Sequence, residues 1–223
     1  MSVRPLSQLC AAIAALWFAL ITPQAWCAGA RLDNTLCDMS SRTGEGDGPY
    51  DYRSSDAHAR MRRAQVEGNH FNLDVRTLKR GQTGSLGSDI DFLLRYVPNH
   101  REALKAISDL ASRSKAEQPD GAGKTVTCYF EYAKAFAPDD QTVRILYGVY
   151  LLKNGGTQRG LTELEEAVRL RPEDMNAQYN LGLAYADMKE YDKAIEHAKT
   201  AYALGHPLPG LRDRLKRAGK WVD

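Results

Sequence analysis

The stretch MNAQYNLGLAYAD at residues 175–187 follows the stretch QTVRILYGVYLLK at residues 141–153 by 34 positions. Each opens one of two consecutive units, residues 141–174 and 175–208. When the units are superposed, most matched positions are small or apolar, as in the pairs Gly148/Gly182, Tyr147/Leu181, Leu151/Tyr185, Gly160/Ala194, Leu161/Ile195, Ala167/Ala201 and Leu170/Leu204. A period of this length is typical of stacked helix pairs that bury their apolar faces against one another. We therefore predict an all-α fold built by repetition.

Two glycines indicate where the helices of each unit meet. Gly148 and Gly182 fall in the middle of a predicted first helix. Glycine costs about 1 kcal/mol there relative to alanine. Close approach of the second helix would offset this cost, and the small pairs Gly160/Ala194 and Ala167/Ala201 would allow it. Residues 154–156 separate the two helices of the first unit, and Pro172 ends it.

The second unit resembles a tetratricopeptide repeat. Leu181, Gly182, Tyr185 and Ala194 occupy the Leu-Gly, Tyr and Ala positions of that family's pattern. The pattern's Trp, second aromatic and Pro positions hold Gln178, Ala198 and His206, and the first unit keeps Gly148 and Pro172. The resemblance implies a helix-turn-helix solenoid that binds a protein or peptide in a groove.

The rest of the chain divides around these units. The spacing from Pro98 to Pro138 is 40 residues, against 34 from Pro138 to Pro172, so residues 99–140 are predicted to form a degenerate helix pair with a longer loop. Residues 31–98 are predicted to be an irregular helical region, with helices over 55–66, 73–80 and 89–97. Apolar residues at helical spacing in 209–223 predict a capping helix, and a basic helix resting on an anionic membrane is the alternative.

The first thirty residues have the layout of a secretory signal peptide. Arg4 precedes an apolar run over residues 9–21, and Ala28-Gly29-Ala30 supplies the small residues of a cleavage site. A run of thirteen is short for a membrane span, which needs about 20 residues. We expect cleavage near Ala30, with Cys27 as the other candidate and a retained anchor as the weaker alternative. We therefore expect an exported bacterial protein, periplasmic or secreted.

Cleavage would leave two cysteines, Cys37 and Cys128. In an oxidising compartment two cysteines suggest one disulfide. The alternative is a buried Cys128 that behaves as a small apolar residue and an unpaired Cys37.

Motifs for chemistry are missing from the sequence. The five histidines show no HExxH spacing, there is no Cys-x-x-Cys pair, and no serine sits in a Gly-x-Ser-x-Gly elbow. Without residues 1–30 the chain has 29 basic and 28 acidic residues, which argues against a general nucleic-acid binder. We therefore predict no enzyme, no metal, no cofactor and no stable membrane insertion.

The resemblance also implies where a partner would bind. In tetratricopeptide repeats the first helices line the groove, which here implies Thr142, Ile145, Val149, Leu152, Lys153, Asn176, Tyr179, Leu183, Ala186 and Asp187. Ile145, Val149 and Leu183 are apolar where a clamp for a peptide's terminal carboxylate would be polar, so that activity is not expected. An apolar groove suits an amphipathic helix or an extended apolar segment. Residues 31–54 of the same chain could also fill it.

Residues 48–53, GPYDYR, admit two interpretations. They can form a strap that pins the N-terminal region onto the helices, or a recognition patch for a peptide or sugar. The first interpretation leaves the repeats as the functional part, in an adaptor or assembly factor of the cell envelope. The second makes the protein a peptide- or carbohydrate-binding accessory.

Overall fold

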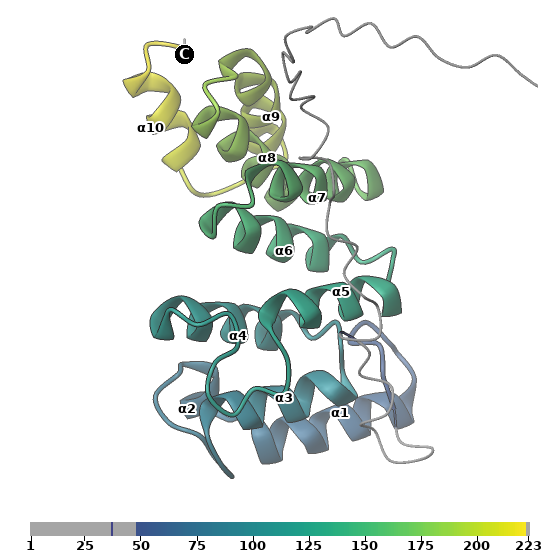
Figure 1. The fold of residues 1–223 in the computed structure, drawn as a ribbon. Coiled ribbons are helices and arrows are strands. Elements are labelled where there is room, and N and C mark those ends of the chain that lie inside the picture. The colour runs from purple at the N-terminus through teal and green to yellow at the C-terminus, as the bar shows by residue number, and fades with distance from the viewer. Residues whose placement is uncertain (1–36, 38–47, 222–223) are drawn as a thin grey trace, which may run out of the picture. The chain divides into compact units, whose positions relative to one another are not determined.

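The computed structural model describes residue 37 and residues 48–221, and the predicted signal peptide and its cleavage site lie outside these residues. The described residues form helices joined by turns and loops, and they contain no strand. The helices are α1 (Ala57–His70), α2 (Leu73–Arg76), α3 (Leu86–Tyr96), α4 (Arg101–Ser114), α5 (Val126–Phe136), α6 (Gln141–Lys153), α7 (Thr157–Leu170), α8 (Met175–Asp187), α9 (Tyr191–Ala203) and α10 (Gly210–Arg217) (Figure 1). The predicted all-α class is confirmed.

The two 34-residue units are helix pairs, α6 with α7 and α8 with α9. First helices pack side by side along the series α4, α6, α8 and α10, and α7 also packs on α8. Small and apolar residues of the second helices, α7 and α9, are packed against the neighbouring helices. The residues without any exposed surface are Leu164, Ala167, Ala194, Ala198 and Ala201. The predicted helix-turn-helix solenoid is therefore present.

One form of connection occurs three times between consecutive pairs. The backbone N–H groups of His100, Asp140 and Asp174 donate to the carbonyl three residues earlier, at 3.0, 3.1 and 3.1 Å. The side chain of each of these residues then caps the next helix by accepting from a backbone N–H of its first turn. Because the first connection joins α3 to α4, the repeated construction extends one helix upstream of residue 99.

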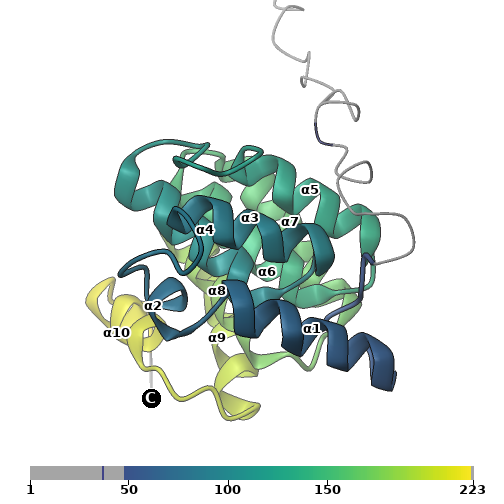
Figure 2. The same cartoon turned by 90° about the horizontal axis from the view of Figure 1, so that it is seen from below.

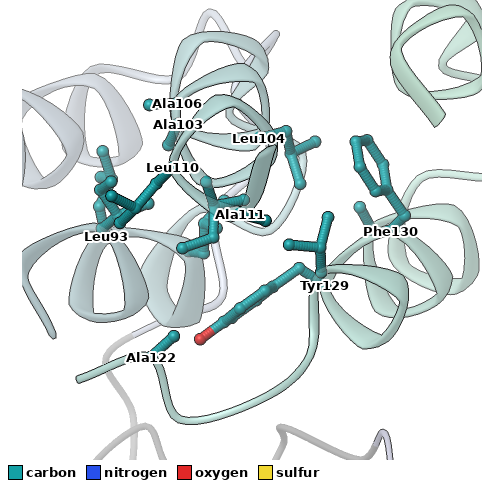
Figure 3. Close-up of a cluster of buried hydrophobic side chains, with 14 of the residues drawn as sticks. Leu93, Ala103, Leu104, Ala106, Leu110, Ala111, Ala122, Tyr129 and Phe130 are labelled. Atoms are coloured by element: carbon teal, nitrogen blue, oxygen red, sulfur yellow. The ribbon is translucent and has the colours of Figure 1, made fainter. Parts of the chain in front are cut away.

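The predicted degenerate pair, α4 and α5, is attached to the N-terminal helices through α3. α3 packs on α1 on one side and on α4 on the other (Figure 1, Figure 2). The loop between α4 and α5 lies directly on α3, since a Cβ added at Gly87 would be 2.1 Å from the carbonyl oxygen of Asp120. The ring of Tyr129 extends from α5 toward Ala122 (Figure 3). Its hydroxyl donates to the buried Asp91 at 2.5 Å.

All three N-terminal helices differ from their predicted bounds, and α1 spans Ala57–His70 where 55–66 was predicted. The helix expected over 73–80 ends at Arg76, because Leu78 adopts a left-handed backbone with φ of 57°. The helix expected over 89–97 begins at Leu86, where the Ser85 side chain caps it by accepting from the Ser88 N–H. The glycine-rich connection before α3, residues 81–84, is held by the buried Asp89 carboxylate, which accepts from the backbone N–H of Gln82 at 2.6 Å.

The C-terminal helix α10 closes the stack as predicted. Leu211 and Leu215 are fully buried against the core formed with α8 and α9, while Lys216 and Arg217 are exposed. Leu208 precedes the helix and is exposed. No helix in the described part of the chain has the length and apolar character needed to cross a membrane.

The Cys37–Cys128 disulfide is present in the structure. The two Cα atoms are 4.8 Å apart, and 91 positions of sequence separate the cysteines. Cys128 lies in the first turn of α5, so the bond ties residue 37 to the degenerate helix pair.

The middle glycines of the two repeats differ in what surrounds them. A Cβ added at Gly148 would lie 2.9 Å from the carbonyl oxygen of Gly160 and 2.7 Å from Leu164 Cγ. At Gly182 the nearest atom, at 2.6 Å, is a terminal methyl carbon of Leu211, and the nearest backbone atom is 3.4 Å away. The second helix thus approaches Gly148 as predicted, whereas α10 makes the tightest contact with Gly182.

Gly148→Ala is therefore expected to lower the free energy of unfolding by about 2 kcal/mol, because α7 must move away from α6. Gly182→Ala should change it by less than about 0.5 kcal/mol, since the Leu211 methyl can shift and alanine favours the helix. Urea denaturation of both variants measures the difference. Equal losses would contradict this account of the two contacts.

Candidate partner-binding surfaces

The predicted groove residues lie on α6 and α8, which pack side by side. Lys153, Asn176 and Asp187 are exposed. The side chains of Thr142, Val149, Leu152 and Leu183 are half-buried, and those of Ile145, Tyr179 and Ala186 are buried. Seven of the ten residues therefore retain exposed surface, and they form a mixed polar and apolar face.

Tyr179 is covered by the chain's own C-terminal part. Its ring stacks on that of His206, with the ring centres 3.8 Å apart, and meets the edge of Tyr202 at 6.5 Å. A Cβ added at Gly210 would lie 2.9 Å from the Tyr179 hydroxyl oxygen. Residues 202–210 therefore occupy this end of the face, and substituting Tyr179 would disturb the attachment of α10.

Residues 48–54, here called the strap, are bound to the helices. The Tyr50 backbone N–H donates to the Tyr96 carbonyl at 2.7 Å. The amide of Asn99, which is buried, accepts from the Tyr52 N–H at 2.8 Å and donates to Asp51 at 2.8 Å and to Asp140 at 2.9 Å. Asn99 therefore joins the strap to the connection before α6.

Charged contacts complete the strap. The Arg53 guanidinium lies 2.7 Å from Asp51 and 2.9 Å from Asp139. Hydrogen bonding from Arg53, opposed by burial and assisted by Asn99, lowers the pKa of Asp51 to about 2. The Tyr52 ring meets the edge of His100 at 4.6 Å. Because these side chains are engaged within the chain, the structure favours the strap over a recognition patch.

A cleft of about 730 Å³ lies beside the ends of α4 and α6, and we call it the α4–α6 cleft. Its lining comes from α4 and the loop after it, from the first turn of α5, and from the ends of α6 and α7 that face each other: Ala111, Ser112, Lys115, Ala116, Glu117, Thr127, Tyr150, Leu151, Lys153, Asn154, Gly156 and Arg159. Lys153 is the one residue that this cleft shares with the predicted groove.

Sequence reasoning missed the other lining residues, because no motif connects them. They come from four helices, and their approach depends on how the degenerate pair packs against α6. Among residues 48–221 and Cys37, no group of three or more His, Cys, Asp or Glu side chains is arranged to hold a metal ion.

Comparison with known proteins finds a repeat family and individual similar proteins, among them one curated protein and one solved structure. Residues 131–209 match the family described as tetratricopeptide repeat. A peroxisomal targeting signal receptor from Eremothecium gossypii is 30% identical over 88 residues, which cover 40% of this chain and 15% of that protein. A solved structure titled "MamA AMB-1" has 16% identity and a TM-score of 0.45, over 72% of this chain and 85% of its own.

Proposed function

Because this chain belongs to the tetratricopeptide repeat family through residues 131–209, we propose that it is a non-enzymatic adaptor or assembly factor that binds a protein partner on α6 and α8. The observation that carries the proposal is the exposed face of these two helices. Lys153 and Asn176 extend from it without a side-chain partner among the described residues, beside the half-buried Val149 and Leu183. Such a mixed surface suits an amphipathic helix or an extended segment with apolar side chains.

The proposal includes export to the bacterial cell envelope. Arg4, the apolar run over 9–21 and the small residues before Arg31 support it at the level of sequence. The Cys37–Cys128 bond supports it chemically, since disulfides persist in oxidising compartments and are rare in the cytosol.

Val149 is the residue best suited to test the proposed face. Its side chain is half-buried, and it belongs to neither of the two buried cores, unlike Tyr179. Val149→Asp should therefore keep the fold while placing a charge where an apolar partner group would dock. We expect capture of a partner from the envelope fraction to fall by about tenfold or more, with helicity and thermal midpoint unchanged.

Leu73→Asp is the matched control, because Leu73 is an exposed leucine on α2, outside the repeats. This variant should capture the partner as the parent protein does. Quantitative mass spectrometry of the captured material gives the comparison, and the mass of the protein recovered from the same fraction shows whether it begins at Arg31. Equal capture by the Val149 variant would refute the proposed face.

A further inference from the structure

The α4–α6 cleft carries an excess of positive charge. Lys115 and Lys153 line it and are exposed, and neither has an ion-pair partner within the described residues. Arg159 also lines the cleft and donates to the Tyr147 hydroxyl at 2.7 Å. The single acidic residue of the lining is Glu117. Lysines at helix C-termini stabilise the helix dipole, but that role leaves their ammonium groups free to bind an anion.

Tyr150 adds a hydrogen-bond donor to the cleft. Only 7% of this residue is exposed, and its hydroxyl has no hydrogen bond to any residue that the structure describes. The hydroxyl oxygen itself keeps contact with solvent, so a ligand in the cleft can reach it. Burial and the nearby Glu117 raise the pKa of Tyr150 to about 12, so the hydroxyl keeps its proton at neutral pH. It can therefore donate a hydrogen bond to an acceptor that enters the cleft.

The size of the cleft limits the shape of that ligand. A helix with its side chains is about 10 to 12 Å across, so it would fill 730 Å³ within roughly two turns. An extended chain advances about 3.3 Å per residue and fits with several residues in place. The Thr127 hydroxyl can donate to or accept from the backbone of such a chain, and the Ser112 hydroxyl, which donates to the Ser108 carbonyl, can accept from its N–H groups.

We propose that the α4–α6 cleft binds an extended acidic segment of the protein partner, with aspartate or glutamate side chains contacting Lys115 and Lys153 and accepting from the Tyr150 hydroxyl. The cleft would thus bind acidic side chains of the partner, whereas the face of α6 and α8 would bind its apolar side chains. This inference rests on the proposed adaptor function and adds the chemistry of the partner.

The test uses a fluorescent hexaglutamate peptide with a blocked N-terminus and an amidated C-terminus. Its binding to the purified protein, followed by anisotropy, should weaken as salt is raised, because exposed charges are screened. Lys115→Gln with Lys153→Gln should weaken binding by about tenfold. Tyr150→Phe, which keeps the buried ring, should weaken it by about threefold.

The matched control is Lys79→Gln with Lys199→Gln. These lysines are also exposed and have no ion-pair partner among the described residues, so the net charge changes by the same amount. The control variant should bind hexaglutamate as the parent does. Equal weakening in both double variants would overturn the proposal, since binding would then follow overall charge.

Two further probes separate sources of negative charge. A hexapeptide of glycine and serine with a free C-terminus offers only a terminal carboxylate, and inorganic phosphate offers only a small anion. Binding of the former as tight as that of hexaglutamate, or displacement of hexaglutamate by an equal concentration of phosphate, would overturn the assignment to acidic side chains. If hexaglutamate fails to bind while capture still depends on Val149, the inference is wrong and the adaptor function stands.

Discussion

Replacing Cys37 and Cys128 together by alanine is expected to lower the free energy of unfolding by about 4 to 5 kcal/mol. The bond joins residues separated by 91 positions, and the entropy that a cross-link removes from the unfolded chain grows with the loop it closes. Cys128 is buried in the first turn of α5, so its removal also loses apolar packing. A loss of this size is a large part of the stability of an ordinary domain.

Guanidinium unfolding of the oxidised protein, the reduced protein and the double variant measures this effect. The reduced protein should lose most of the same stability, and the variant slightly more, because the variant also lacks the packing of the Cys128 side chain. A thiol titration of native protein kept from reductant provides the control, and it should find neither of these two cysteines free. If the titration finds Cys37 and Cys128 free in the native protein, the bond is absent. If all three samples are equally stable, the bond does not stabilise the fold.

Asn99→Ala is expected to lower the free energy of unfolding by about 2 to 3 kcal/mol and to release the strap. The variant removes the acceptor of the Tyr52 N–H and a donor to the buried Asp140 carboxylate. Buried groups left without partners cost about 1 to 3 kcal/mol each. The Asp51 carboxylate loses a hydrogen bond as well, although Arg53 continues to contact it.

Urea denaturation measures the loss, and limited digestion with trypsin at Arg53 reports on the strap directly. Cleavage after Arg53 should be faster in the variant at a trypsin concentration that leaves the parent intact. Asn69→Ala is the matched control, because Asn69 is exposed on α1 and its side chain has no partner among the described residues. If both variants resist trypsin equally, the Asn99 amide does not hold the strap.

The parts of the fold that the sequence predicted are those with a local or periodic signature. The pairing of Gly148 with Gly160 followed from two small residues at matching places in one helix pair, and the structure has this contact. The cap formed by Leu211 and Leu215 followed from their spacing in the same way. The predicted length of α2 was wrong, because Leu78 has a left-handed backbone conformation that leucine rarely adopts.

The binding surfaces were less predictable. The repeat pattern placed the ten predicted groove residues on α6 and α8, where the structure has them, but it could not show that His206 covers Tyr179. It also could not bring Lys115, Tyr150 and Lys153 to one cleft, since that depends on the packing of α4 against α6. The same holds for Asn99, which contacts residues more than forty positions away on each side.

The sequence by itself thus determined the helical class, the two 34-residue helix pairs and the two cysteines available to pair. Periodic apolar residues and small residues record these features locally, because each unit packs in the same way against its neighbour. Only the tertiary structure decided which groove residues are exposed, what holds the strap and where the charged cleft lies. These features depend on contacts between distant, unrepeated residues, and such contacts leave no period in the chain.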